Sequence, residues 1–252
     1  MSMNGQAVWL TGASSGIGEA LVPALLAAGA RLTISARRAD VLEAVAARHP
    51  GAPLHVLPVD VTDREAVHRA AAEVRARWGA IDLALFNAGT HIPVHAASWN
   101  ADDFRTLIDV NYVSLVYGIE AVLPDMLARR RGHIAGVASV AGYRALPTAA
   151  AYGASKAAAI LMLDALRFDV ERQGIAVSVI NPGFVRTPLT DRNRFHMPGI
   201  IDATDAARLI VRGLERRTRE IHFPAAFSWS LKLLRVLPYP LYHRLVMWNT
   251  TA

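Results

Sequence analysis

A tyrosine and a lysine stand four positions apart, at Tyr152 and Lys156, and Ser139 precedes them. Four positions correspond to about one helical turn, so on a helix the phenol and the ammonium lie on the same face. A free tyrosine has a pKa of about 10, and a neighbouring ammonium favours the phenolate and lowers that pKa. A phenol tuned in this way can exchange a proton with an alkoxide or an alcohol. The three residues therefore indicate acid–base chemistry on a carbonyl or alcohol, although the pair alone also fits a solvated helix surface.

A glycine-rich turn near the N-terminus indicates a second kind of site. The sequence Thr11-Gly-Ala-Ser-Ser-Gly-Ile-Gly18 follows a short apolar run, 6–10, and precedes a helical pattern. Glycines allow the backbone to turn tightly and to approach a pyrophosphate, and the N–H groups at the start of a helix bind negative charge. We therefore expect a dinucleotide-binding turn, formed by Gly12, Ser14, Ser15, Gly16, Ile17 and Gly18.

Two alternatives remain for this turn. Its Gly12-x-Ser14-x-Gly16 spacing also matches the nucleophile elbow of hydrolases, in which Ser14 would be the nucleophile. That elbow follows several strands because its oxyanion hole uses an earlier loop, whereas this turn follows the first predicted strand. The other alternative is a turn with a purely structural role.

The end of the second predicted strand bears on the choice of cofactor. In dinucleotide-binding folds, an acidic residue about 20 positions beyond the glycines binds the adenosine ribose of NAD. Here the strand ends in Ser35-Ala36-Arg37-Arg38, with no carboxylate. Guanidinium groups bind phosphate oxygens in pairs, and cations at the start of a helix are otherwise unfavourable. We therefore expect NADP(H) as the cofactor, with Arg37 and Arg38 on its 2′-phosphate, and two solvated arginines as the alternative.

These residues need a scaffold, and the pattern of the whole chain predicts one. Apolar runs that predict strands alternate with patterns that predict helices. We expect strands at 6–10, 31–35, 54–59, 81–86, 133–139 and 175–180, and helices at 19–28, 40–48, 63–78, 102–131 with a bend at Pro124, 150–173 and 204–217. This alternation predicts an α/β fold, a single doubly wound parallel sheet of Rossmann type with helices on both faces. One domain would include residues 1–220 and an apolar C-terminal extension, 221–252.

Composition excludes several classes of protein. The 252 residues are 53% hydrophobic and 19% charged, which excludes a disordered chain. The absence of cysteine excludes disulfides, thiolate metal sites and cysteine nucleophiles. The net charge is +6, but the arginines are scattered along the chain, so no nucleic-acid partner is expected. His91 and His95 have a metal-like spacing, but Pro93 between them disfavours a helix, so we expect no metal site.

Several short motifs follow one another in a fixed order over about three quarters of the chain. They are Thr11–Gly18, Asp60-Val61, Asn87-Ala88-Gly89, Asn111, Ser139, Tyr152-x3-Lys156 and Asn181-Pro182-Gly183. This series resembles that of the short-chain dehydrogenase/reductase family. Each motif alone is weak, whereas their joint occurrence is specific. Phe86 and Ala138 depart from the common family pattern, and neither is a position that the family uses for catalysis.

The resemblance implies a role for each matching residue. Tyr152 would donate and accept the proton, Lys156 would lower the pKa of Tyr152 and hold the nicotinamide ribose, and Ser139 would bind the substrate carbonyl. Asn111 would hold a water in a proton relay behind Lys156. Asp60 and Val61 would contact the adenine, and the rest of the cofactor would lie against Asn87, Ala88, Gly89, Pro182, Gly183, Val185 and Thr187.

The apolar C-terminal extension has three open interpretations. It is rich in Leu, Trp, Phe and Tyr, with few basic residues. It can cover the core or an oligomer interface, form a lid over a lipophilic substrate pocket together with the loop 189–201, or lie at a membrane surface with Trp and Arg among the headgroups. Pro238 and Pro240 interrupt it, and no run of 18 apolar residues lacks a charge, so no membrane-spanning helix is expected.

Taken together, these patterns predict a cytoplasmic, NADP-dependent oxidoreductase that acts on a small lipophilic carbonyl or alcohol, with peripheral membrane contact left open. By analogy with the family, we expect a homodimer or homotetramer built through helices 102–131 and 150–173. A competing hypothesis of another class is a non-catalytic NADP-binding or membrane-associated interaction protein on a reductase fold. The complete set of Asn111, Ser139, Tyr152 and Lys156 argues against it, because a binding module needs no paired tyrosine and lysine.

Overall fold

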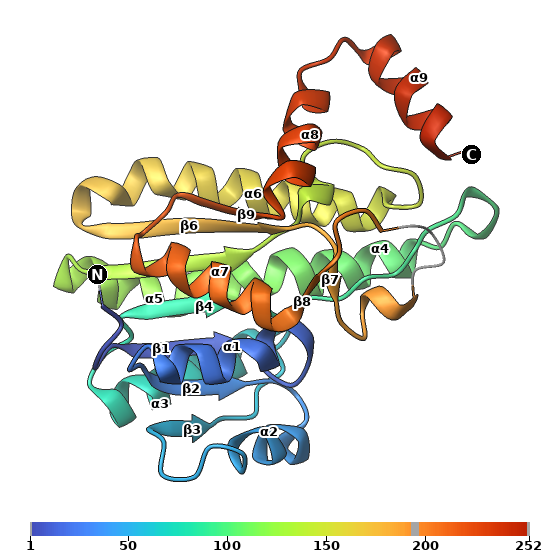
Figure 1. Cartoon of the computed structure of the whole chain (residues 1–252). Helices are drawn as coiled ribbons and strands as arrows, with labels where there is room; N and C mark the ends of the chain where they lie inside the picture. Colours follow the sequence, from blue (N-terminus) through green and yellow to red (C-terminus); the bar gives the residue numbers. More distant parts are fainter. Residues whose placement is uncertain (1, 193–196, 251–252) are drawn as a thin grey trace.

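A parallel sheet of seven strands forms the centre of the molecule (Figure 1). The structure is a computed structural model that describes residues 2–192 and 197–250. The strands lie in the order β3-β2-β1-β4-β5-β6-β9, so β1 and β4 flank the switch point at which such sheets bind ligands. The predicted single doubly wound parallel sheet is confirmed. The strand bounds are β1 Ala7–Thr11, β2 Arg31–Ser35, β3 Leu54–Val56, β4 Leu83–Phe86, β5 Gly132–Val137, β6 Ile175–Pro182 and β9 Glu220–Phe223.

Helices cover both faces of the sheet, as crossovers between parallel strands require (Figure 1). One face packs against α1 (Gly16–Ala27), α2 (Ala39–Ala46) and α7 (Ala203–Glu215), and the other against α3 (Arg64–Trp78), α5 (Ser114–Arg129) and α6 (Ala150–Val170). A further helix, α4 (Ala101–Ile108), packs on α6. A small sheet pairs β7 (Val185–Arg186) with β8 (Ile201–Asp202), and α8 (Ala225–Arg235) and α9 (Tyr239–Thr250) project from the body.

The helix predicted at 102–131 is interrupted, although not at Pro124. It consists of α4 and α5 joined by a π turn, Asp109–Val113, and Pro124 lies inside α5. The hydroxyl of Ser114 donates a hydrogen bond to the carbonyl oxygen of Val110 at this turn, over 2.6 Å. Turns of this kind break the regular helical ladder and often occur at functional sites. A π turn has no distinctive composition, so the sequence pattern does not reveal it.

The sheet extends beyond the domain boundary expected at residue 220. Residues Glu220–Phe223 form β9, which pairs with the end of β6, and both Ile221 and Phe223 are buried in the core. The segment outside the sheet therefore begins at Pro224. An alternation over four residues is too short for a sequence pattern to separate it from the apolar segment that follows.

One helical stretch in the described part of the chain, Ala101–Arg129, is long and apolar enough to cross a membrane by length and composition alone. It comprises α4, the π turn and α5, and Val122 and Met126 on it are buried in the core. Packing against the sheet and the neighbouring helices accounts for its apolar character.

Candidate active site

One cleft of about 520 Å³ lies at the carboxyl ends of the strands. Of the predicted site residues, Asn111 alone is outside its lining. The others line it: Gly12, Ser14, Ser15, Gly16, Ile17, Gly18, Arg37, Arg38, Asp60, Val61, Asn87, Ala88, Gly89, Ser139, Tyr152, Lys156, Pro182, Gly183, Val185 and Thr187. The cleft is also lined by residues that the sequence analysis does not single out, such as Thr62, Thr90, Thr106, Val110 and Thr190. Most of these residues lie next to a motif in the sequence, and this proximity could have identified them.

The glycine turn closes the cleft at the end of β1, and the shape of the site requires its glycines. Gly12 and Gly16 have φ angles of +70° and +59°, which favour glycine. A side chain on Gly12 would come within 2.7 Å of the Ala88 backbone, and one on Gly18 would overlap the carbonyl oxygen of Gly12. Ser15 caps α1 without a side-chain hydrogen bond, so the N–H groups of the first turn can donate to an anion. The turn therefore fits the pyrophosphate of a dinucleotide.

Hydrogen bonds join this turn to the end of β4. The side-chain amide of Asn87 donates to the carbonyl oxygens of Thr11 (3.2 Å) and Gly12 (3.1 Å). The hydroxyl oxygen of Thr11 accepts from the backbone N–H groups of Asn87 (3.1 Å) and Ala88 (3.3 Å). The two strands at the switch point are thereby fixed relative to each other, and Asn87 holds the turn that it adjoins.

Two exposed guanidinium groups stand where β2 ends, at one end of the cleft. Arg37 and Arg38 line the cleft with Asp60 and Thr62, and neither guanidinium has a hydrogen bond or ion pair within residues 2–192 and 197–250. Burial raises the pKa of Asp60, but hydrogen bonds from Thr62 and the charge of Arg37 outweigh burial and lower it. Asp60 is therefore an ionised carboxylate near the charge of Arg37.

Ser139 and Tyr152 meet at the opposite end of the cleft. Ser139 follows β5 and caps a 3₁₀ turn, where its Oγ accepts from the N–H of Ala141 over 3.1 Å. Burial raises the pKa of Tyr152, and a hydrogen bond with Ser139 lowers it by less. The net effect is a raised pKa for Tyr152. The lowered pKa expected from the sequence therefore does not arise from the protein groups alone. The cost of removing a phenolate from water dominates at this depth.

Lys156 is buried on α6, one helical turn beyond Tyr152. Its Nζ donates to the carbonyl oxygen of Val137 over 2.9 Å and lies 5.8 Å from the centre of the Tyr152 ring. Burial lowers the pKa of Lys156 to about 8. Gly89 leaves room for the ammonium, since a Cβ on Gly89 would lie 3.3 Å from Nζ. The lysine is thus held close to the tyrosine and titrates only slightly above neutral pH.

Asn111 lies behind the cleft, in the π turn, and its side chain is engaged by protein groups. Its Oδ1 accepts from the N–H of Thr90 over 2.8 Å. Its Nδ2 donates to the carbonyl oxygen of Thr90 and to the hydroxyl of Ser155, each over 3.0 Å. Both amide hydrogens are used within the protein, so the water that the family resemblance implies would have to donate to an oxygen atom of Asn111. The side-chain amide fixes the loop after β4 against α6.

His91, one of the two histidines that follow Asn87-Ala88-Gly89, packs against the tyrosine. The rings of His91 and Tyr152 meet edge to face, with centroids 4.7 Å apart and planes at 73°. A hydrogen bond from the N–H of Val94 to the carbonyl oxygen of Thr148, over 3.0 Å, holds this loop in place. His91 therefore restricts the orientation of the Tyr152 ring. Within the described residues, no three His, Asp or Glu side chains are grouped as metal ligands would be.

The segment 189–201, expected to be part of a lid, lies partly outside the described residues, because 193–196 are not described. Before that gap, Leu189 lines the cleft, and after it Ile201 belongs to β8. The hydroxyl of Thr190 accepts from the N–H of Thr187 over 3.0 Å and donates to the carbonyl oxygen of Val185 over 2.7 Å. This short turn fixes the wall of the cleft that follows β6.

The sequence pattern of the short chain dehydrogenase family matches residues 6–197, which include all of the motifs described above. The chain belongs to the short-chain dehydrogenase/reductase family. It is therefore an oxidoreductase of a family that binds nicotinamide dinucleotide cofactors and acts on small molecules, commonly as oligomers. The family resemblance found in the sequence is confirmed.

Individual members of the family are similar over most of their length. An uncharacterized oxidoreductase of Myxococcus xanthus is 37% identical over 235 residues, which cover 92% of this chain and 93% of that protein. Dehydrogenase/reductase SDR family member 7B of Bos taurus is 31% identical, with coverage of 95% and 79%. A short-chain dehydrogenase/reductase from Burkholderia phymatum, solved in complex with NAD, has a TM-score of 0.85 at 25% identity and coverage of 92% and 94%.

Proposed function

We propose that this short-chain dehydrogenase/reductase transfers hydride between NADPH and the carbonyl carbon of a small lipophilic substrate, or in reverse from the alcohol to NADP. The observation that carries the proposal is the content of one cleft. Ser139 follows β5 and lies with Tyr152 and Lys156, Arg37 and Arg38 follow β2 with β1 and β4 between, and the glycine turn lines the same cleft. This order fits a dinucleotide whose nicotinamide lies at the tyrosine and whose adenosine phosphate lies at the arginines.

Three side chains divide the proton chemistry in this proposal. The bound cofactor supplies the hydride when a carbonyl is reduced. Ser139 holds the substrate oxygen by a hydrogen bond, and Tyr152, kept protonated by a pKa that burial raises, donates its proton to the alkoxide oxygen. Lys156 then favours the phenolate, because its buried ammonium lies 5.8 Å from the centre of the ring.

The preference for NADP(H) rests on charge at the end of β2. Arg37 and Arg38 are exposed in the cleft, and Arg38 is the N-cap residue of α2. A cation at a helix N-terminus is unfavourable unless an anion lies nearby. Paired guanidinium groups bind a phosphate more strongly than they bind a ribose hydroxyl. The 2′-phosphate of NADP satisfies both conditions.

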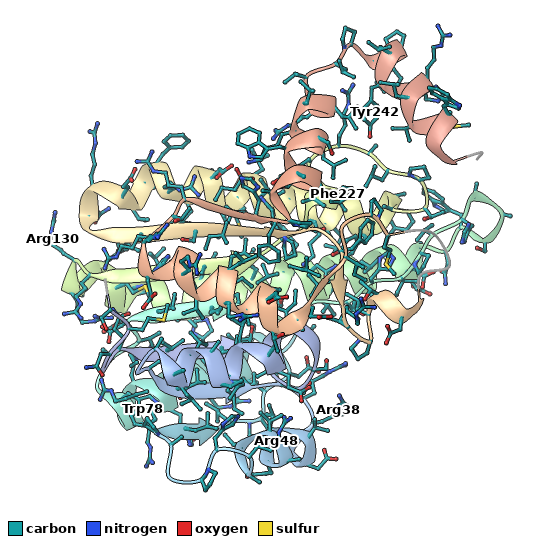
Figure 2. The ribbon with its side chains drawn as sticks, viewed as in Figure 1. Arg38, Arg48, Trp78, Arg130, Phe227 and Tyr242 are labelled. Carbon is teal, nitrogen blue, oxygen red and sulfur yellow. The ribbon has the colours of Figure 1, made fainter. Side chains whose placement is uncertain are left out.

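A binding titration tests the cofactor site. Nicotinamide fluorescence is followed as NADPH or NADH is added to the wild type, to Arg37→Ala and to Arg48→Ala as a matched control. Arg48 is an exposed arginine near the same helix, paired with Glu19 and absent from the cleft lining (Figure 2). We expect the wild type and the control to prefer NADPH, and Arg37→Ala to lose that preference. Equal affinity of the wild type for both cofactors would contradict the proposed role of Arg37.

The lining of the cleft supports a lipophilic substrate, because the apolar side chains of Val110, Pro188 and Leu189 contribute to it.

Two exposed apolar side chains on α6 support self-association. Leu161 and Phe168 on α6 are 72% and 83% exposed, an unusual exposure for large apolar side chains on one helix. Sedimentation equilibrium should give a homodimer or homotetramer, and Phe168→Asp should shift the protein toward the monomer. A wild type that sediments as a monomer would contradict this assembly.

The C-terminal extension supports peripheral contact of a cytoplasmic enzyme with an anionic membrane surface. Trp229 and Leu233 on α8 and Val236 at its C-cap recur at helical spacing and are 61%, 67% and 76% exposed. Residues 224–250 contain no Asp or Glu, so the segment is cationic. The full chain should sediment with phosphatidylserine vesicles, and Leu233→Glu should weaken that binding. Equal binding to phosphatidylcholine vesicles would contradict the electrostatic part of this proposal. Equal binding by Leu233→Glu would contradict the apolar part.

The non-catalytic alternative is disfavoured by the cost of burying Lys156. Folding removes this ammonium from water and lowers its pKa to about 8, which reduces the free energy of unfolding. A protein that only binds a cofactor gains no function from this loss of stability. Family membership also disfavours the hydrolase interpretation of Ser14.

A further inference from the structure

The segment that connects the two proposed catalytic residues is hydrogen-bonded to the C-terminal extension at two consecutive positions, and the position before them is hydrogen-bonded to β9. This connecting segment, residues 143–145, lies between Ser139 and Tyr152 in the chain and passes beside α8 (Figure 1). It is far from the extension in sequence, so the contacts are tertiary. They place α8 and α9 in a position to control the substrate end of the cleft.

Arg144 makes the central contact. Its Nη1 donates to the carbonyl oxygens of Leu234 (2.8 Å), Arg235 (3.0 Å) and Leu237 (2.8 Å). These carbonyls belong to the last turn of α8 and the bend after it, where a helix lacks partners and attracts a cation. The guanidinium also lies 3.9 Å from the centre of the Tyr242 ring, on α9. One side chain therefore holds the end of one helix and the face of the next.

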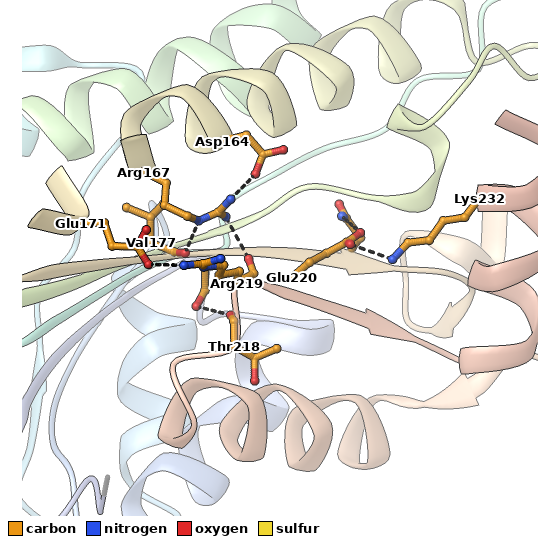
Figure 3. A network of polar contacts seen from close by, with 10 residues as sticks. Asp164, Arg167, Glu171, Val177, Thr218, Arg219, Glu220 and Lys232 are labelled. Carbon is orange, nitrogen blue, oxygen red and sulfur yellow. Dashed lines mark hydrogen bonds and ion pairs between the residues drawn. The ribbon is translucent and has the colours of Figure 1, made fainter. Parts of the chain in front are cut away.

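The residues on either side of Arg144 add two contacts. The hydroxyl of Tyr242 donates a hydrogen bond to the carbonyl oxygen of Ala145. The buried phenol of Tyr143 donates to Glu220 over 2.6 Å. Lys232 of α8 donates to the same carboxylate over 2.7 Å, and Figure 3 shows this contact between Lys232 and Glu220. The connecting segment is thus bonded to β9, to α8 and to α9.

The other end of α8 is joined to the wall of the cleft that follows β6. The rings of Phe184 and Phe227 lie 5.3 Å apart, and a Cβ on Gly183 would come within 2.9 Å of the Phe227 ring. Asn181, immediately before this wall, donates to Glu220 over 2.9 Å. Figure 2 shows Phe227 at the base of α8 and Tyr242 farther out. Helix α8 therefore joins the loop after β6 to the segment between Ser139 and Tyr152.

We propose that Arg144 is a positioning residue through which α8 and α9 fix the segment between Ser139 and Tyr152 and so set how carbonyl substrates are held. The inference rests on the proposed function and names the part of the chain that governs its substrate end. The glycine turn and Arg37, which hold the adenosine part of the cofactor in the proposed function, lie on other loops, so Arg144 acts on substrate binding and turnover and leaves NADPH binding unchanged.

Amide hydrogen exchange tests the structural part without any substrate. Arg144→Ala is compared with Arg144→Lys, which keeps three N–H donors, and with Arg244→Ala, an exposed arginine on α9, all saturated with NADPH. We expect faster exchange confined to residues 140–149 and to α8 and α9 in Arg144→Ala, partial protection in Arg144→Lys and none of this in the control. Unchanged exchange, or a uniform rise across the sheet, would overturn the proposal. If Arg144→Ala does not fold, Tyr242→Phe removes only the contact with Ala145 and serves in its place.

Steady-state kinetics test the functional part. Short and long straight-chain methyl ketones are offered with NADPH to the same variants. We expect kcat/KM to fall about tenfold or more in Arg144→Ala, with the NADPH dissociation constant unchanged and with partial recovery in Arg144→Lys. A kcat/KM equal to that of the wild type would refute the inference while the proposed function stands. If the wild type reduces no ketone, but faster exchange in Arg144→Ala is confined to residues 140–149, α8 and α9, the ketone reductase assignment is refuted. The structural role of Arg144 then stands.

Discussion

Asn111 and Ser155 are joined by a hydrogen bond of 3.0 Å, from the Nδ2 of the first to the Oγ of the second. Ser155 donates in turn to the carbonyl oxygen of Tyr152 over 2.7 Å, and Asn111 accepts from the N–H of Thr90. One buried amide thereby connects the π turn, α6 and the loop after β4. The orientation of Tyr152 and Lys156 toward that loop depends on this connection.

Replacing Asn111 by alanine should destabilise the fold and slow turnover. The variant loses three hydrogen bonds, one buried and two partly buried, each worth about 0.5–1.5 kcal/mol, so the free energy of unfolding should fall by roughly 2–4 kcal/mol in urea titrations. Asn100→Ala is the matched control, since Asn100 caps the exposed start of α4 and should cost about 1 kcal/mol without affecting turnover. Equal losses in the two variants would show that the Asn111 amide has no special role.

Replacing Tyr152 by phenylalanine should remove the proton donor and keep the shape of the cleft. We expect turnover to fall on the order of 10²–10⁴-fold, with NADPH binding retained. Tyr239→Phe is the control, because Tyr239 is 71% exposed on α9. A Tyr152→Phe enzyme that keeps near wild-type turnover would assign the proton transfer to another group.

Replacing Gly18 by alanine should abolish cofactor binding. The new Cβ would overlap the carbonyl oxygen of Gly12, so the turn must move away from the position that fits a pyrophosphate. Gly79→Ala is the control. It places a side chain at a φ of +86° with nothing within 4 Å, and it should lower stability without changing NADPH affinity. Fluorescence titration with NADPH measures both, and normal binding by Gly18→Ala would contradict the assignment of the turn.

His133 should make the protein sensitive to acid. Its Nε2 donates to the hydroxyl of Ser178 over 2.8 Å, because that hydroxyl gives its own proton to the carbonyl oxygen of Thr218. Burial, with a smaller contribution from the charge of Arg217, lowers the pKa of His133 from 6.5 to about 3. Between these two values the unfolded chain binds a proton that the folded chain does not, so stability falls as pH falls from 6.5 toward 3.

The size of this effect can be isolated with His133→Gln, which keeps a donor for Ser178 and does not titrate. We expect the wild type to lose roughly 4–5 kcal/mol more than this variant across that pH range, in urea titrations at successive pH values. His95→Gln, at an exposed loop position, should follow the wild-type curve. Parallel curves for all three proteins would show that His133 is not the acid-sensitive group.

Local patterns in the sequence determine the parts of this protein that depend on neighbours in the chain. The turn after β1 needs glycine at Gly12, Gly16 and Gly18 because of the backbone angles and the close approach of adjacent segments, and its spacing is visible without a structure. Tyr152 and Lys156 share a face of α6 because a helix repeats about every four residues. The alternation of strands and helices likewise predicts the parallel sheet and its helical layers.

Only the tertiary structure decides what surrounds those residues. Burial raises the pKa of Tyr152 and lowers that of Lys156, and burial is set by segments distant in the chain. Three contacts join segments that are distant in the chain: the His91 ring packs on Tyr152, the Asn111 amide bonds to Ser155, and Arg144 donates hydrogen bonds to the end of α8. No local spacing encodes such contacts, because they form when the sheet brings its loops to one edge. The sequence by itself therefore determines the chemical groups and the scaffold, and the packing of loops and extension decides their protonation and orientation.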